Sequence, residues 1–369
     1  MVVESQLHAG LGHHAQSALP PSLPRTVMPE SIPSASLRPG QPFIAADVGG
    51  TYARLGLVQM GEDGKVAVLE YRRYACAAHP SLAAILRAFA DAVPVDVDSV
   101  RAEHAVVAIA GRLEGDTLIN SNLPWPVSLS QTRRDADIAH LGLLNDFEAV
   151  ACAMPHIDPV AMTRVCGPDR PSAGPALVLG PGTGFGASLC LPSTFQPGSP
   201  PRVLASEAGH ASLAAGNERE LDLVRHLLKR WSHVDNERVL SGPGLINTYR
   251  ALCEIDGRVP ELDSPVMITA AASERTDAHA VEAVTMFCAL LGSLAGDLAV
   301  TFGADSIYLA GGIPAQIGDL LLESEFAARF LNKGVLGEVL AKVPVWLVDH
   351  GQLGLIGAAA WYFERQAEY

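Results

Sequence analysis

The chain has 369 residues, 49% of them hydrophobic and 18% charged, which indicates a globular protein with a core large enough for two domains. Its 40 acidic residues outnumber the 26 basic ones and give a net charge of −14, so the surface repels nucleic-acid phosphates and anionic lipids. This argues against nucleic-acid and membrane partners. A small anionic ligand stays compatible with the composition, because backbone N–H groups can hold one.

The six cysteines are scattered, without the Cys or His spacing of a zinc site, and several lie in apolar runs. We therefore predict free, buried thiols and a reducing compartment, the cytoplasm. No apolar run reaches the ~18 to 20 residues that a membrane span needs. The first residues also lack a basic segment followed by an apolar one, so no secretory signal is expected.

Residues 1–41 contain six prolines and several serines without periodicity, and we predict a disordered extension there. The pattern after it predicts an α/β layer on a mixed sheet. The expected elements are strands at 43–48, 54–60 and 66–73, a helix at 80–93, strands at 104–110 and 141–146, and a helix in "FEAVACAM".

A second α/β block starts near residue 157. Residues 176–190 repeat the opening plan of strand, glycine-rich turn and strand. The later elements are helices at 217–231, 243–253 and 276–302, a strand within 305–316 that ends in Gly-Gly before a helix, a strand at 344–350, and a closing helix in "LGLIGAAAWYFERQ". The plan occurs twice, which predicts two similar α/β domains with a cleft between them. We expect a small domain at 42–156 plus 350–369 and a large domain at 157–349.

Two glycine turns join strands in corresponding places of the two blocks, "DVGGT" at 47–51 and "GPGTG" at 180–184. Each is first of all a hairpin turn, because glycine adopts positive φ readily. Glycines also let backbone N–H groups approach a phosphate, and the threonines add hydroxyl donors. As a pair, the turns suggest clamps on a polyphosphate. Neither is a Walker A loop, and neither is a GxGxxG segment entering a helix.

Two further motifs each allow a functional and a structural interpretation. "LAGGI" (309–313) has room for a base or a ribose, or is a glycine pair that packs a helix on a sheet. Asn145 and Asp146 follow a buried strand and precede a helix, which is the usual place of an α/β active site. Taken alone, they are better explained as a helix N-cap, for which Asn and Asp are favoured.

"SEAGH" contributes Glu207 and His210 on a glycine-containing loop, and "DNERVLSGPG" adds further polar groups. Such loop side chains are more often simply solvated than ligands.

With these motifs in order, the chain resembles the bacterial glucokinases of the hexokinase–actin–Hsp70 ATPase superfamily. It resembles the group that lacks the zinc-binding cysteine motif of the repressor-type sugar kinases. The resemblance runs from about residue 43 to the C-terminus. It rests on "DVGGTYARL", "SNLPW", "LLNDFEAVA", "LGPGTGFGAS", "SEAGH", "ERVLSGPGLINTYRA" and "LAGGI".

The resemblance implies phosphoryl transfer from ATP to the 6-hydroxyl of glucose. Asp146 matches the family's general base, which we expect to work with an ordinary pKa. The residues that match sugar ligands are Asn145 and Asp146, Glu207 and His210 on the anomeric side, Glu237, and Asn122 of "SNLPW".

The nucleotide side is also implied by the resemblance. Asp47 would face Mg²⁺ through water, and Gly49, Gly50 and Thr51 would line the phosphate path. Gly182, Thr183 and Gly184 match the second phosphate loop, and Gly311 and Gly312 match the adenosine motif. The family also suggests a homodimer.

The sequence departs from the family pattern at the first turn. Tyr52 stands where the family most often has Asn, and its ring either crowds the nucleotide or points away. Ala208 replaces a common glycine in "SEAGH". The departures leave open a weakly catalytic, sugar-binding regulatory protein of the same fold, or a kinase that prefers another hexose such as mannose or glucosamine.

Overall fold

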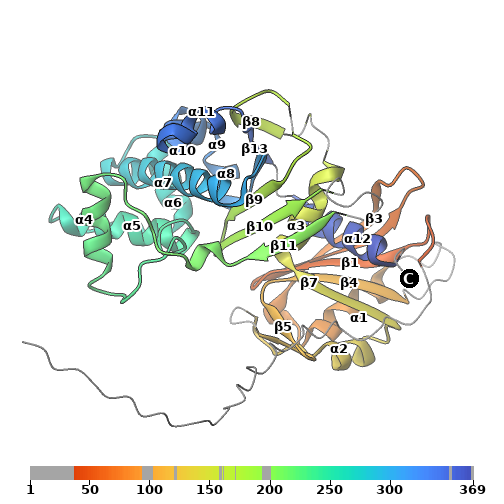
Figure 1. The fold of residues 1–369 in the computed structure, drawn as a ribbon. Coiled ribbons are helices and arrows are strands. Elements are labelled where there is room, and N and C mark those ends of the chain that lie inside the picture. The colour runs from red at the N-terminus through yellow and green to blue at the C-terminus, as the bar shows by residue number, and fades with distance from the viewer. Residues whose placement is uncertain are drawn as a thin grey trace, which may run out of the picture. The chain divides into compact units, whose positions relative to one another are not determined.

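The computed structural model describes residues 37–93, 103–119, 123–157, 160, 162–170, 172–192, 201–348 and 351–366. These residues form two large β-sheets flanked by helices, and the first sheet precedes the second along the chain (Figure 1). The expected order of alternating strands and helices is confirmed.

The first sheet has the strand order β3-β2-β1-β4-β7. Antiparallel pairing joins β3, β2 and β1, and parallel pairing joins β1, β4 and β7, so the sheet is mixed as predicted. Its strands are β1 (Phe43–Val48), β2 (Tyr52–Met60), β3 (Val66–Ala75), β4 (His104–Ile109) and β7 (His140–Asn145).

Both faces of this sheet are covered, which explains why β1 is a continuous apolar run. Ile44, Ala46 and Val48 belong to a core with α1 (Leu82–Ala92), whose first turn is capped by Ser81. Phe43 and Ala45 face the opposite way, into a core with α12 (Leu353–Gln366). Leu37, in the segment before β1, packs into this second core.

The second sheet has the order β11-β10-β9-β12-β13-β8. β11, β10 and β9 are antiparallel neighbours, whereas β9, β12 and β13 are parallel, so the plan of the first sheet occurs again. The strands are β8 (Met162–Cys166), β9 (Ala176–Pro181), β10 (Phe185–Leu191), β11 (Arg202–Ser206), β12 (Ser306–Ala310) and β13 (Val345–Val348).

Helices cover one face of the second sheet and form the largest apolar core. They are α4 (Glu218–Leu227), α5 (Gly242–Ile255), α6 (Pro265–Ser273), α7 (Ala278–Phe302), α8 (Gly312–Gln316), α9 (Gly318–Glu323), α10 (Phe326–Leu331) and α11 (Gly337–Leu340). α7 is long and apolar enough to cross a membrane by length and composition, contrary to the expectation from the sequence. Most of it is buried in this core, which is the placement of a core helix.

α3 (Asp146–Ala153) packs against both sheets. Its Ala149 lies in the core with α12 and the first sheet, and its Val150 and Ala151 lie in the core on the other face of the second sheet. The beginning of α3 is therefore fixed by contacts from both halves of the fold (Figure 1).

The predicted extension is wrong for its last residues. Leu37 is 5% exposed and packs with Phe43 and α12, and the Gly40 N–H donates to the Met60 carbonyl over 2.8 Å. Residues 1–36 lie outside the described residues. The domain boundaries at 42, 156 and 350 stay a prediction.

Several short elements were not expected from the sequence. They include the hairpin of β5 (Arg112–Glu114) and β6 (Thr117–Ile119), the edge strands β8 and β11, and α6. The polar helix α2 (Leu129–Asp135) lies between β4 and β7, where the expected order β-β-β-α-β-α-β-α has a helix. The six cysteines are free, as predicted; four of them are buried and two are partly buried.

Candidate active site

The first glycine turn closes the β1–β2 hairpin, so the hairpin interpretation is confirmed. The Gly49 N–H donates to the Tyr52 carbonyl over 3.0 Å, and Asp47 pairs in register with Arg54. Gly50 and Thr51 are exposed at the tip. The turn therefore presents its backbone and the Thr51 hydroxyl to solvent, beside the Asp47 carboxylate.

Arg54 is a site residue that the sequence analysis missed. Its Nη1 donates to Asp47 Oδ2 over 3.0 Å, and the Asp47 side chain is only 15% exposed. The signal was present in the sequence, because a turn at residues 49–52 places residue 54 directly opposite residue 47 in an antiparallel pair.

Tyr52 begins β2, and its side chain is on the same face of the sheet as Arg54, two residues further on, and contacts β3. Its ring is 39% exposed and packs under the Arg73 guanidinium of β3, 4.3 Å from the ring centroid. A cation–π contact of this kind fixes the ring over β3.

The second glycine turn closes the β9–β10 hairpin. The Gly182 N–H donates to the Gly184 carbonyl over 2.8 Å, and the Gly182 carbonyl accepts from the Gly242 N–H, at the start of α5, also over 2.8 Å. Thr183 is exposed at the tip. Both predicted phosphate turns thus present a threonine at the tip of a hairpin.

Glu237 lies against the second turn. Its Oε2 accepts from the Phe185 N–H over 2.8 Å, and its own N–H donates to the Gly209 carbonyl over 2.9 Å. An ideal Cβ on Gly184 would lie 2.6 Å from this oxygen, so a larger residue there would require the Glu237 carboxylate to move. Glu237 therefore ties the "GPGTG" turn to the "SEAGH" loop, a contact that the sequence did not reveal.

Asn145 and Asp146 both lie at the start of α3, but their side chains differ in the hydrogen bonds that they make. The Asn145 side chain is the N-cap, since its Oδ1 accepts from the backbone N–H groups of Phe147 and Glu148 at 2.9 and 3.2 Å. Asp146 Oδ1 accepts from the Phe147 N–H over 2.9 Å. The capping interpretation is thus right for Asn145, whereas the Asp146 carboxylate is hydrogen-bonded to the backbone at the same turn.

The Asp146 carboxyl has a raised pKa of about 6. Burial is the main cause, and the negative charges of Asp47 and Glu207 add to it against the lowering effect of the Phe147 N–H. The expectation of an ordinary pKa is wrong, because burial at the start of α3 depends on tertiary packing. The shift also shows that three predicted site carboxylates, from β1, α3 and the "SEAGH" loop, lie within electrostatic reach of one another.

The "SEAGH" loop places Glu207 and His210 at the surface, whereas Ala208 is buried in the core. His210 Nδ1 lies 3.9 Å from the buried Asp235 carboxylate, and the Asn236 side-chain amide donates to the Ala208 carbonyl over 3.0 Å. Asp235 and Asn236 therefore hold the loop from beneath, and the alanine is accommodated.

The two glycines of "LAGGI" behave differently. Gly311 has a φ of +141°, and a Cβ there would come within 2.6 Å of the Pro181 carbonyl, which confirms the packing interpretation for this residue. A Cβ on Gly312 would meet no described atom within 4 Å. Gly312 therefore leaves free space beside the β9–β10 turn. Asn122 lies outside the described residues.

The carboxylates suit a magnesium ion that is held mainly by phosphate oxygens. Mg²⁺ prefers oxygen ligands and keeps several waters, so a single carboxylate such as Asp47 suffices on the protein side. A cation there would also relieve the repulsion that raises the Asp146 pKa. The described residues contain no group of three or more side chains that would form an all-protein metal site.

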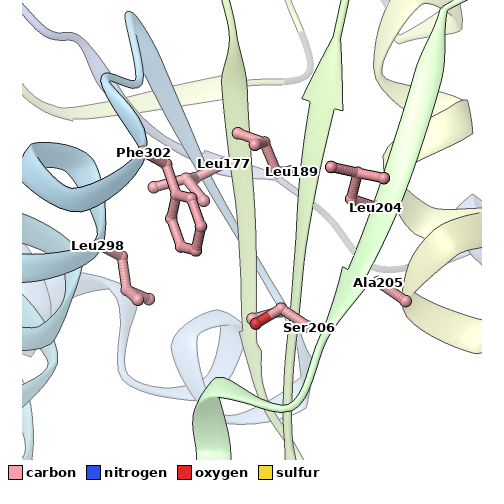
Figure 2. Close-up of a pocket in the computed structure, with 8 residues that line it drawn as sticks. Leu177, Leu189, Leu204, Ala205, Ser206, Leu298 and Phe302 are labelled. Carbon is pink, nitrogen blue, oxygen red and sulfur yellow. The ribbon is translucent and has the colours of Figure 1, made fainter. Parts of the chain in front are cut away.

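An apolar pocket lies outside this group of residues. Figure 2 shows it between the second sheet and the end of α7, with a volume of about 230 Å³. Its lining is apolar except for Ser206, the residue before Glu207. Such a lining has too few polar groups to hold a sugar or a triphosphate. It is formed by Leu177, Ala187, Leu189, Leu204, Ala205, Ser206, Leu298 and Phe302.

Comparison with known proteins agrees with the arrangement of the motifs. The family model described as Glucokinase matches residues 44–365. This chain belongs to the glucokinase family. A "Glucokinase-like protein" of Xylella fastidiosa (strain 9a5c) is 44% identical over 88% of this chain and 96% of the relative. A glucokinase of Chromobacterium violaceum is 38% identical over 89% of this chain and 91% of the relative.

Solved structures of the family share the fold. The crystal structure of a glucokinase from an Antarctic psychrotroph has a TM-score of 0.75 and 32% identity, and the match covers 87% of this chain and 98% of that one. The predicted fold class, two related α/β halves of the actin-like ATPase type, is confirmed for this glucokinase-family chain.

Proposed function

We propose that the protein is an ATP-dependent glucokinase that transfers the γ-phosphoryl group to the 6-hydroxyl of glucose, forming glucose 6-phosphate in the cytoplasm. The observation that carries this proposal is the position of Asp146. It lies at the start of α3 with one oxygen committed to the Phe147 N–H, and Asp47 and Glu207 are close enough to raise its pKa. A half-buried carboxylate so placed suits a general base for a sugar hydroxyl.

Asp146 would accept the proton of the 6-hydroxyl as the phosphoryl group arrives. With a pKa of about 6, it is mostly ionised at pH 7 and more basic than an ordinary aspartate. Asn145 caps α3 and keeps the carboxylate aimed. Because phosphoryl transfer depends mainly on alignment and charge stabilisation, this fixed geometry is the main contribution of the pair.

The two hairpin turns would hold the triphosphate from both sides. Gly50 and Thr51 offer backbone N–H groups and a hydroxyl near Asp47, while the Gly49 N–H closes that turn. Thr183 and Gly184 do so from the second sheet, where the Gly182 N–H closes the turn. Mg²⁺, near Asp47, would neutralise the phosphate charge when bound. Gly312 leaves the space that we assign to adenosine, and Gly311 provides the close-packed turn before it.

The sugar would be held by polar groups around Asp146. Glu207 and His210 are exposed on a loop that Asn236 and Asp235 fix from below. Glu237 joins this loop to the second phosphate turn, so it supports sugar and phosphate sites together. Asn122 is assigned to the sugar by resemblance alone. Acceptor carboxylates suit adjacent sugar hydroxyls, which an apolar pocket cannot discriminate.

A sugar-binding regulatory protein is the alternative, raised by the presence of Tyr52 where the family most often has Asn. Its ring packs under Arg73 on β3, the strand on the far side of β2 from Asp47, which supports the kinase. The two functions differ in turnover, not in sugar binding.

A coupled assay with Mg·ATP and glucose, mannose or glucosamine tests the proposal. Turnover with glucose at the highest kcat/KM supports a glucokinase, and a higher kcat/KM with another hexose would reassign the substrate. Absence of turnover in the native protein, with recovery in Tyr52→Asn, would support the regulatory function. Sedimentation of the purified protein tests the proposed homodimer.

A further inference from the structure

Cys76 is bonded to the first phosphate turn through two of its groups. It begins a short 3₁₀ turn after β3, and its backbone N–H donates to the Thr51 carbonyl over 2.9 Å. Its thiol donates to the Gly49 carbonyl, with 3.4 Å between sulfur and oxygen. Both acceptors belong to the "DVGGT" turn, so one residue holds the turn on either side of Gly50.

Trp125 in turn holds Cys76. The indole N–H donates to the Cys76 carbonyl over 3.4 Å, and the His79 N–H donates to the same oxygen over 3.2 Å. Cys76 is fully buried and Trp125 is 9% exposed, and both belong to the core beneath β1 and β2. A series of hydrogen bonds therefore connects Trp125 with Cys76 and Cys76 with the "DVGGT" turn, and both side chains are buried.

The chemistry of the thiol fits a donor and not a nucleophile. Burial raises the pKa of the Cys76 thiol, so it keeps its proton at neutral pH. Gly50 between the two acceptors is exposed, and glycine has more backbone freedom than any other residue, so fixing the Gly49 and Thr51 carbonyls limits the conformations of the tip. A turn held in one conformation can present its remaining N–H groups to a phosphate.

We propose that Cys76 is a positioning residue for the nucleotide, which acts by fixing the Gly49–Thr51 turn in the conformation that receives the phosphates, with Trp125 bracing it. This inference rests on the proposed kinase function for its effect on ATP. Its structural part, the fixing of the turn, does not depend on that function. Cys76 touches no reacting atom and is therefore not a catalytic residue.

The kinetic test compares Cys76→Ala with Cys288→Ala, which removes a second fully buried thiol from the core around α7. We expect Cys76→Ala to raise the KM for ATP about three- to tenfold and to leave the KM for glucose unchanged, as for a lost hydrogen bond to a phosphate-binding turn. Cys288→Ala should keep both KM values. Cys76→Ser, which retains a donor, should restore most of the ATP affinity. Trp125→Phe, which removes only the indole donor, should raise the KM for ATP less.

The second measurement is amide hydrogen exchange over residues 48–53 in the ligand-free protein. Faster exchange there in Cys76→Ala than in Cys288→Ala supports the proposal even if the native protein phosphorylates no sugar. Failure of the kinase function can therefore be distinguished from failure of the role proposed for Cys76. If Cys76→Ala does not fold, Cys76→Val gives the same comparison with the volume retained. Equal exchange in both variants, or an equal change in the KM values for ATP and glucose, would overturn the proposal.

Discussion

Phe147 occupies the space above Gly186, so closely that a Cβ on Gly186 would overlap the ring. Gly180 faces the same ring from the neighbouring strand β9, and the Ser188 hydroxyl of β10 donates to the Phe147 carbonyl over 3.0 Å. Phe147 directly follows Asp146. The second sheet therefore sets the position of the proposed base, although Asp146 itself follows a strand of the first sheet.

Gly186→Ala should displace Phe147 and with it Asp146. We expect a loss of about 1–3 kcal/mol in the free energy of unfolding, as for overpacking of a core. A displacement of about 1 Å at the base costs on the order of a hundredfold in kcat. Denaturant unfolding and steady-state kinetics measure the two effects. A fully active and equally stable Gly186→Ala would contradict the proposed link between the second sheet and the base.

Gly182→Ala tests the second phosphate turn without the packing effect. A Cβ on Gly182 would meet no described atom within 4 Å, and the residue has no positive φ that would strain an alanine. We therefore expect an unchanged melting temperature. The KM for ATP should rise up to about tenfold, because the methyl group keeps the backbone from a phosphate oxygen. An unchanged KM for ATP would remove Gly182 from the phosphate site.

The hairpin turns and the repeated plan could be predicted because glycine pairs between apolar runs are local signals. The edge strands β8 and β11 were missed, since "MTRVC" and "RVLAS" are short, half-exposed and contain arginine. The Asp47–Arg54 pair followed from the hairpin register and was overlooked. The contact of Glu237 with Phe185 and the raised pKa of Asp146 depend on residues far apart in the chain, so no local pattern contains them.

The pH dependence of turnover should report the Asp146 carboxyl. Because its pKa in the free protein is about 6, kcat/KM for glucose should be level near neutral pH and fall about tenfold per pH unit below 6. Arg54→Lys, which leaves Asp146 and its neighbouring carboxylates in place, serves as a control and should keep the inflection near 6. An inflection near 4 would mean that Asp146 titrates as an ordinary aspartate or is not the base.

Asp146→Asn should abolish most turnover and yet stabilise the fold above pH 6. The carboxyl has a pKa of about 6 in the folded chain against 3.8 for an unperturbed aspartate. The folded chain therefore binds the proton more tightly, and the stability gained below pH 3.8 is lost as the pH rises through 6. Replacement by the neutral amide should then raise the free energy of unfolding by up to about 3 kcal/mol at pH 7.5, and by little at pH 3.5. Urea unfolding at both pH values measures the difference. Equal stability of variant and native protein at pH 7.5 would show that the carboxylate is well solvated.

His104, at the far end of the first sheet, should give the free energy of unfolding the opposite dependence on pH. Its ring is 3% exposed, stacks on His140 with centroids 4.5 Å apart, and shares a hydrogen bond of 2.9 Å between Nδ1 and the Tyr362 hydroxyl. Burial, with the nearby His140, lowers the pKa of His104 to about 4, and the Glu103 charge opposes the shift. Between pH 6.5 and 4 the unfolded chain binds the extra proton, so stability should fall as the pH decreases through this window.

His104→Gln should remove that fall, because the amide is neutral throughout and still reaches the Tyr362 hydroxyl. The shift from 6.5 to about 4 corresponds to about 3 kcal/mol between pH 7 and pH 4. We therefore expect the free energy of unfolding of His104→Gln, measured in urea, to gain on that of the native protein by up to this amount as the pH is lowered. The double variant Asp146→Asn, His104→Gln separates this contribution from the opposing one of Asp146. Parallel curves for the native protein and His104→Gln would mean that His104 is protonated in the folded chain as readily as in the unfolded one.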